Sequence, residues 1–333
     1  MEWINEKAKT LKQGAIRAMF DRANTMTGVI SLGIGEPDMP TPKLVCEAAK
    51  EALDKGITHY TPNAGTLAVR QAIAEKSYLK ELHYDPNTEI IVTNGGMGAL
   101  SLLFLVLLNK RDEILIQDPQ WLNYVAQVAY CDGTAVRVPT DLAHNFEMQP
   151  ETIEKLITPH TKALMINTPN NPTGVVYSAE TLSRLADILT EKSKAFGHNI
   201  FLVSDEPYRD IAFDGKKVPY PAAFYPHTLT CFSYSKSLSL PGERLGYVAV
   251  RPGCEGEDIL VDMMSQISRF TGHNCPPSII QRAVSRCQDV TSDLSVYETN
   301  MNLLYDKLTA LGFEVERPGG TFYILSLIHI SEP

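Results

Sequence analysis

Short runs of apolar and β-branched residues recur through the middle of the chain and predict the strands of one sheet. They lie at residues 89–93, 113–117, 134–139, 162–167, 200–204, 228–232 and 246–250. Most are separated by stretches with helical spacing, such as residues 178–196, which open with a serine suited to an N-cap. Mostly apolar strands that alternate with helices are buried on both faces. The pattern therefore predicts an α/β fold with a largely parallel seven-stranded sheet between helices.

The two ends of the chain differ from this middle part. Residues 1–30 are polar with a helical pattern, a Gly/Pro-rich loop follows, and helical stretches return after about residue 276. We expect a large domain over residues 40–275, and a smaller α+β domain built from residues 1–39 and 276–324. A cleft between the two domains would be the natural binding site.

Composition narrows the possible partners and the compartment. The 333 residues carry a net charge of −9 without a Lys/Arg block, which argues against nucleic acid and anionic membrane surfaces. The six cysteines are scattered and form no CxxC pair, so neither a metal site nor a disulfide framework is expected. The N-terminus is too charged for a signal peptide, and the longest apolar run, residues 99–108, is too short to span a bilayer. We expect a cytoplasmic protein.

Unusual groups follow the predicted strands at the point where each strand ends. They are "NGGMGA" after residue 93, "DPQWLNY" after 117, "TPNNPTG" after 167, "DEPY" after 204 and "SYSK" after 232. Ligands of open parallel sheets bind at the carboxyl ends of the strands. We therefore expect these five groups to share one site.

The segment "SYSKSLSLPGERLGY" holds a lysine among hydroxyls, with an arginine eight residues later. One interpretation is that Lys236 and Arg244 are solvated surface charges, which is the usual state of such residues. The other is a site in which a desolvated Lys236 attacks a carbonyl carbon while Ser233, Ser235 and Arg244 hold a phosphate. A nucleophilic lysine beside a phosphate site indicates pyridoxal phosphate.

Two of the other groups fit the same cofactor. The backbone of Gly95, Gly96 and Met97 opens a helix and could bind an anion, although an ordinary Gly-rich turn looks the same. Asp205 could face a pyridinium nitrogen and Tyr208 a phenolic oxygen, although an N-cap and a core tyrosine are equally compatible.

Two single residues are less specific. Asn171 in "NNPTG" would give the phenolic oxygen a second partner, but the sequence also suits a plain β-turn. Trp121 follows a strand end and could stack on an aromatic ring, or pack without any ligand.

Taken in chain order, these motifs give the sequence its family resemblance. "GEPDMPTP", "HYTPNAGTLAVRQAIA", "VTNGGMGAL", "NNPTG", "SDEPY" and "SYSKSLSLPGERLGY" extend over nearly the whole chain to about Ile324. The chain resembles the class I/II aminotransferases, which are pyridoxal-phosphate enzymes of fold type I in the aspartate aminotransferase superfamily. The resemblance implies an amino-group transfer between an L-amino acid and a 2-oxo acid by a ping-pong mechanism.

The resemblance also assigns roles to residues. Lys236 would be the Schiff-base lysine and proton shuttle, Gly35 would lie against the substrate carboxylate, and Trp121 would stack on the cofactor ring. Tyr60 would reach the phosphate of a neighbouring subunit, which implies a homodimer with shared sites. Met97 departs from the family, which often has a polar side chain there. The other implied cofactor contacts are Gly95, Gly96, Asn171, Asp205, Tyr208, Ser233, Ser235 and Arg244.

Two alternatives remain open at this stage. A C–S β-lyase of the same fold uses nearly the same residues. A non-catalytic phosphate-ligand-binding protein is a third possibility, but binding alone requires neither Lys236 nor Asp205. Hydrolase motifs of the GxSxG and HExxH kinds are missing from the sequence.

The last residues do not continue the family pattern. The sequence is similar to the family up to "GGTFYI", after which "SLIHISEP" ends the chain. We expect residues 325–333 to be a non-native tail and the smaller domain to be incomplete; the alternative is a genuine divergent end. The arginine that the resemblance implies for the substrate carboxylate is not assigned here. We therefore expect the chain as written to bind cofactor weakly or not at all and to transaminate poorly.

Overall fold

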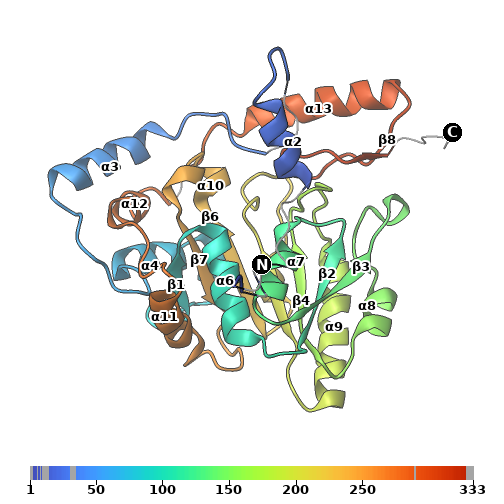
Figure 1. Cartoon of the computed structure of the whole chain (residues 1–333), viewed down its shortest axis with the longest axis horizontal. Coiled ribbons are helices and arrows are strands. Elements are labelled where there is room, and N and C mark those ends of the chain that lie inside the picture. Colours follow the sequence, from blue (N-terminus) through green and yellow to red (C-terminus); the bar gives the residue numbers. More distant parts are fainter. Residues whose placement is uncertain are drawn as a thin grey trace.

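A seven-stranded sheet forms the centre of the molecule (Figure 1). The structure is a computed structural model that describes residues 3–5, 7, 9, 15–30, 35–288 and 290–327. In the sheet the strand order is β1-β7-β6-β5-β4-β2-β3. The strands are β1 (Ile90–Thr93), β2 (Glu113–Asp118), β3 (Thr134–Pro139), β4 (Thr161–Asn167), β5 (Phe201–Asp205), β6 (Thr228–Ser233) and β7 (Gly246–Val250).

The pairing within this sheet is mostly parallel. Strands β3, β2, β4, β5 and β6 run parallel to their neighbours, whereas β7 pairs antiparallel with both β6 and β1. Each predicted run corresponds to one strand, with ends that agree within one residue. The predicted α/β fold with a largely parallel seven-stranded sheet is therefore confirmed.

Helices cover both faces of the sheet. On one face the apolar core joins the strands to α6 (Gly95–Leu107), α7 (Asn123–Tyr130) and α11 (Leu260–Phe270). On the other face, α3 (Lys43–Asp54), α4 (Leu67–Ala74), α5 (Ser77–Lys80) and α12 (Ser278–Val284) pack near β1 and β7. The same face carries α8 (Pro150–Leu156) and α9 (Ala179–Phe196) near β2 and β4. Among the described residues, no helix has both the length and the apolar character needed to cross a membrane.

Local sequence accounts for where two of these helices begin. Helix α9 is capped as predicted, because the side chain of Ser178 accepts a hydrogen bond from the Thr181 N–H at 3.1 Å. Helix α6 begins at Gly95, four residues before the predicted apolar run, because Gly95 supplies a φ of +70° at the turn out of β1. The glycines thus bring the first turn of α6 to the carboxyl-end edge of the sheet.

Elements from the two chain ends lie apart from the sheet. Figure 1 draws α2 (Ala15–Ala23), α13 (Ser295–Ala310) and β8 (Glu314–Val315) together at one end of the molecule. Strand β8 pairs antiparallel with β9 (Ser326–Leu327), within the predicted tail, of which residues 328–333 lie outside the described residues. The domain boundaries and the foreign origin of the tail stay predictions. The remaining short helices are α10 (Tyr234–Ser237), η1 (Leu142–His144), η2 (Pro221–Ala223) and η3 (Pro241–Glu243).

Strand register aligns the site-forming ends of the strands. Asn167 at the end of β4 is opposite Asp205 at the end of β5, and Asp205 is opposite Cys231 of β6. Ser233 at the end of β6 is opposite Gly246 of β7. The loops that leave β4, β5 and β6 therefore start at the same edge of the sheet.

Candidate active site

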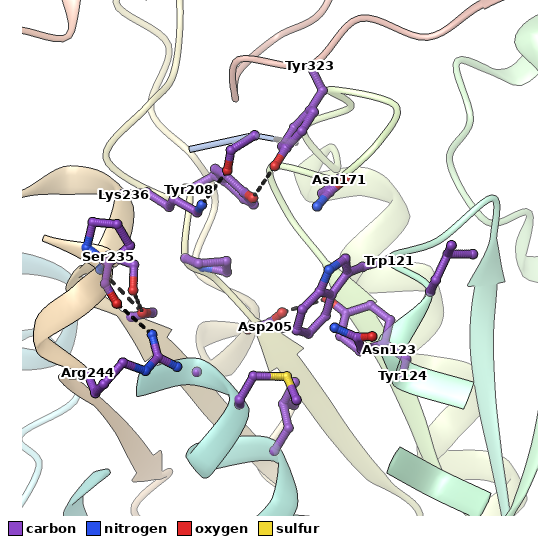
Figure 2. A pocket seen from close by; sticks show the side chains of 18 residues that line it. Trp121, Asn123, Tyr124, Asn171, Asp205, Tyr208, Ser235, Lys236, Arg244 and Tyr323 are labelled. Carbon is purple, nitrogen blue, oxygen red and sulfur yellow. Dashed lines mark hydrogen bonds between the residues drawn. The ribbon is translucent and has the colours of Figure 1, made fainter. Parts of the chain in front are cut away.

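A cavity of about 430 Å³ lies at this edge of the sheet (Figure 2). Its lining includes these predicted site residues: Gly35, Gly96, Met97, Trp121, Asn171, Asp205, Tyr208, Ser233, Ser235, Lys236 and Arg244. Gly95 lies beside the cavity rather than in its lining. Tyr60 does not line it either, and its side chain is 90% exposed.

Lys236 is carried into the cavity by α10, the short helix that follows β6 directly. Its Nζ donates a hydrogen bond to the carbonyl oxygen of Gly35 at 2.8 Å. Burial lowers the pKa of Lys236 to about 8; Glu36 opposes this shift and the guanidinium of Arg244 adds to it. About a tenth of the amine is therefore unprotonated and nucleophilic at pH 7.

Asp205 ends strand β5 and is 4% exposed. Its Oδ2 accepts a hydrogen bond from the hydroxyl of Tyr124 at 2.5 Å. Burial raises the pKa of Asp205 to about 7; the Tyr124 hydrogen bond lowers it and nearby Glu206 raises it. A cation placed opposite this carboxylate would pull its pKa back down, so the position is suited to a positively charged ring nitrogen.

The loop after β4 is tied to the end of β5 through one asparagine. The side chain of Asn167 donates to the carbonyl oxygen of Asp205 at 2.8 Å, and its Oδ1 accepts from the Asn171 N–H at 2.7 Å. Asn167 therefore sets the distance between the two loops that carry Asn171 and Asp205.

Two serines and an arginine form a polar end of the cavity. Ser233 Oγ donates to Ser235 Oγ at 2.8 Å and accepts from the Ser235 N–H at 3.3 Å. Arg244 has a φ of +51° and is held by a hydrogen bond from its Nη1 to the Pro241 carbonyl oxygen at 2.8 Å. Hydroxyl groups and a guanidinium in one place are a donor set for a phosphate.

Gly95 brings the first turn of α6 against this polar end. A Cβ at Gly95 would lie 2.7 Å from Arg244 Nη2, so no larger residue fits without moving the guanidinium. The free N–H groups at the start of α6 favour an anion at the same place. The start of the helix, the guanidinium and the hydroxyls thus lie close together at one end of the cavity.

Aromatic side chains line the opposite part of the cavity. The ring of Trp121 meets that of Tyr124 edge to face, with centroids 5.2 Å apart and an interplanar angle of 83°. Tyr208 Oη lies 3.0 Å from Tyr323 Oη, and burial raises the pKa of both phenols. Both phenols therefore remain protonated at neutral pH.

Tyr124 and Tyr323 are site residues that the sequence analysis missed. Tyr124 stands three residues after Trp121 in "DPQWLNY", and this spacing could have placed both on one side of the turn entering α7. Tyr323 comes from "GGTFY", 115 residues after Tyr208, and no local signal in the sequence pairs the two.

Comparisons with known proteins agree with this geometry. Residues 27–331 match the model of the family described as aminotransferase class I and II. The chain is 34% identical to an aromatic-amino-acid aminotransferase 2 of Thermococcus litoralis, over 98% of this chain and 83% of the relative. It is 35% identical to an aspartate/prephenate aminotransferase of Thermus thermophilus, over 98% of this chain and 84% of the relative.

Solved structures give the same result. A crystal structure of an aminotransferase from Eubacterium rectale superposes with a TM-score of 0.91 at 36% identity, covering 97% of this chain and 84% of that one. The aspartate aminotransferase of Thermus thermophilus with maleate superposes with a TM-score of 0.87 at 34% identity, covering 98% and 85%. The family model and the relatives extend over nearly all of this chain, and it therefore belongs to the class I and II aminotransferases.

Proposed function

We propose that the cavity binds pyridoxal phosphate and moves an amino group between an L-amino acid and a 2-oxo acid by a ping-pong mechanism. The observation that carries the proposal is the amine of Lys236. It has a pKa of about 8 and lines the same cavity as the buried carboxylate of Asp205 and the anion site at Arg244. A phosphate-binding protein without catalysis would need neither the amine nor the carboxylate.

The residues present fit this cofactor. The phosphate would be held by Ser233, Ser235, Arg244 and the N–H groups at the start of α6, where the absence of a side chain at Gly95 leaves room for the guanidinium. Asp205 would face the ring nitrogen. The other ring contacts would be Trp121, Asn171 and Tyr208. When bound, pyridoxal phosphate supplies an electron sink for charge that develops at the substrate Cα.

Lys236 performs the proton transfers in this proposal. Its neutral Nζ accepts a proton from the substrate Cα and later returns one. The pKa of about 8 keeps both protonation states accessible. Asp205 holds the ring nitrogen in its protonated form; at about 4 Å and an effective dielectric constant near 20, the attraction is about 4 kcal/mol before desolvation. The hydrogen bond from Tyr124 keeps the carboxylate in one orientation for this role.

We further propose a homodimer in the cytoplasm, with the domain division given above. The exposed phenol of Tyr60 is available to reach the phosphate site of a second copy. The six cysteines are free, which suits a reducing compartment.

A panel of amino donors with 2-oxoglutarate tests the reaction class. The proposal expects the 2-oxo acid of the donor to form only when an acceptor is present, with parallel double-reciprocal plots. Pyruvate and ammonia released without an acceptor would instead show the β-lyase reaction. The matched controls are Lys236→Ala, which should abolish turnover, and Lys162→Ala, which removes a lysine outside the cavity.

A further inference from the structure

The segment that carries Tyr323 is fixed to both loops of the cavity. The Gly319 N–H donates to the Gly174 carbonyl oxygen at 2.9 Å, in the turn that follows Asn171. The Thr321 N–H donates to the Ile211 carbonyl oxygen at 2.9 Å, three residues after Tyr208. These two backbone hydrogen bonds fix the position of the chain from which the Tyr323 side chain extends into the cavity.

The Tyr323 ring occupies the space beside Gly35. A Cβ at Gly35 would lie 2.0 Å from Tyr323 Oη and 2.4 Å from the ring carbon that bears it. Figure 2 shows Tyr323 pointing into the cavity with its hydroxyl directed at that of Tyr208. The ring therefore packs on the peptide whose carbonyl oxygen accepts the hydrogen bond from Lys236 Nζ.

We propose that Tyr323 is a positioning residue of the amino-transfer site, which fixes the hydroxyl of Tyr208 through a phenol–phenol hydrogen bond and holds the Gly35 peptide by packing against it. The proposal rests on the function proposed above. It adds to that function a residue from the C-terminal segment, far in sequence from the lysine.

The number of protons that a phenol can donate determines which of the two tyrosines is the donor in the hydrogen bond between them. A phenol has one proton to donate. Because burial raises the pKa of both tyrosines, each keeps its proton. When Tyr208 donates to the ring oxygen of a bound ligand, Tyr323 must be the donor between the two phenols. A donor that itself accepts a hydrogen bond donates more strongly, so Tyr323 reinforces the bond from Tyr208 to the ligand.

The first test removes only the hydroxyl. Tyr323→Phe weakens the bond to the ring oxygen, and the extra negative charge left there favours a proton on the neighbouring lysine nitrogen. We expect the pKa read from the absorbance titration of the lysine-bound cofactor to rise by about half a unit. This shift corresponds to a fraction of the free energy of one hydrogen bond. Tyr130→Phe, which removes an exposed phenol hydroxyl outside the lining of the cavity, should leave the titration unchanged.

A second test uses the cofactor-free protein and the contact with Gly35. Gly35→Ala places a methyl group where Tyr323 lies, so it should lower the melting temperature of the parent chain. In the background of Tyr323→Leu, which removes the ring, Gly35→Ala should lower the melting temperature by clearly less. An equal loss in both backgrounds would show that the ring does not press on Gly35 and would overturn the packing part.

The outcomes separate this inference from the function on which it rests. If borohydride traps cofactor on Lys236 but Tyr323→Phe titrates like the parent chain, the positioning role is wrong and the proposed function stands. A lower melting temperature of Tyr323→Phe with an unshifted titration would likewise contradict the inference, because it would reduce Tyr323 to a structural residue. If borohydride instead traps the cofactor on another lysine, the proposed function is overturned, while the melting cycle still decides the contact.

Discussion

At the scale of single residues, the site depends on two buried groups whose pKa values are displaced toward neutrality. Burial lowers that of Lys236 to about 8 and raises that of Asp205 to about 7. Each displacement lowers the stability of the cofactor-free fold at neutral pH. Such pairs of displaced groups in a cavity are typical of catalytic sites.

The first prediction concerns turnover after Asp205→Asn. The amide still accepts the hydrogen bond from Tyr124, so the cofactor should bind, but a neutral partner no longer keeps the ring nitrogen protonated. We expect kcat to fall on the order of 10²-fold or more, which is about 3 kcal/mol in the barrier. Steady-state kinetics at saturating cofactor measures this. Near-normal kcat would contradict the electron-sink role of Asp205.

The second prediction concerns stability of the cofactor-free protein. A pKa of about 7 in the folded state lies above the ordinary aspartate value of 3.8, so the native state binds more protons than the unfolded one between these values. The contribution of Asp205 is full below pH 4 and is lost as pH rises through 7, by about 4 kcal/mol in the limit. Asp205→Asn should therefore flatten the fall in unfolding free energy over this interval. Asp258→Asn, at an exposed position, should not; an unchanged slope for Asp205→Asn would contradict the burial argument.

At the scale of elements, the site is made by the ends of strands and the start of one helix. The first turn of α6 and the guanidinium of Arg244 meet only because Gly95 has no side chain. The same position also requires a positive φ, which glycine adopts without strain.

The third prediction separates these two demands. Gly95→Ala adds both strain and a clash with Arg244, whereas Gly197→Ala, at a φ of +74° with nothing within 4 Å, adds strain alone. We expect both substitutions to lower the unfolding free energy by about 1 kcal/mol, which is seen as a lower melting temperature. Only Gly95→Ala should also weaken cofactor binding, by about tenfold or more. Fluorescence titration with pyridoxal phosphate measures the affinity. Equal affinities of the two variants would contradict a role of the first turn of α6 in binding the phosphate.

Elements were more predictable from the sequence than contacts between them. The bounds of β3 and β7 agree with prediction because alternation of apolar runs and turns specifies strands locally. Lys236 and Arg244 were found from one segment, since both follow β6 closely. Tyr124 was missed because sequence spacing does not show which carboxylate a phenol reaches. Tyr323 was missed because its partner lies in another loop, and only tertiary packing brings the two together.

At the scale of the whole molecule, the proposal requires two chains for each complete site. Tyr60 is 90% exposed and lies outside the lining of the cavity of its own chain. In the proposal, this exposed phenol acts when a second copy brings its own phosphate site next to it.

The fourth prediction tests this sharing by mixing subunits. Hybrids of Tyr60→Phe and Lys236→Ala chains place both substitutions in one site and leave the other site intact. Each mixed dimer has one intact site of two, so we expect it to have about half the activity of the unmutated dimer. Activity no greater than the average of the Tyr60→Phe and Lys236→Ala homodimers would mean that each site is formed by one chain.

The central claim is that Lys236 is the residue to which the cofactor attaches. Borohydride reduction of the chain loaded with pyridoxal phosphate, followed by peptide mapping, tests it most directly. The account predicts that the label appears on the peptide containing Lys236 and disappears in Lys236→Arg, while the Lys162→Ala control keeps it. Label on another lysine would contradict the account.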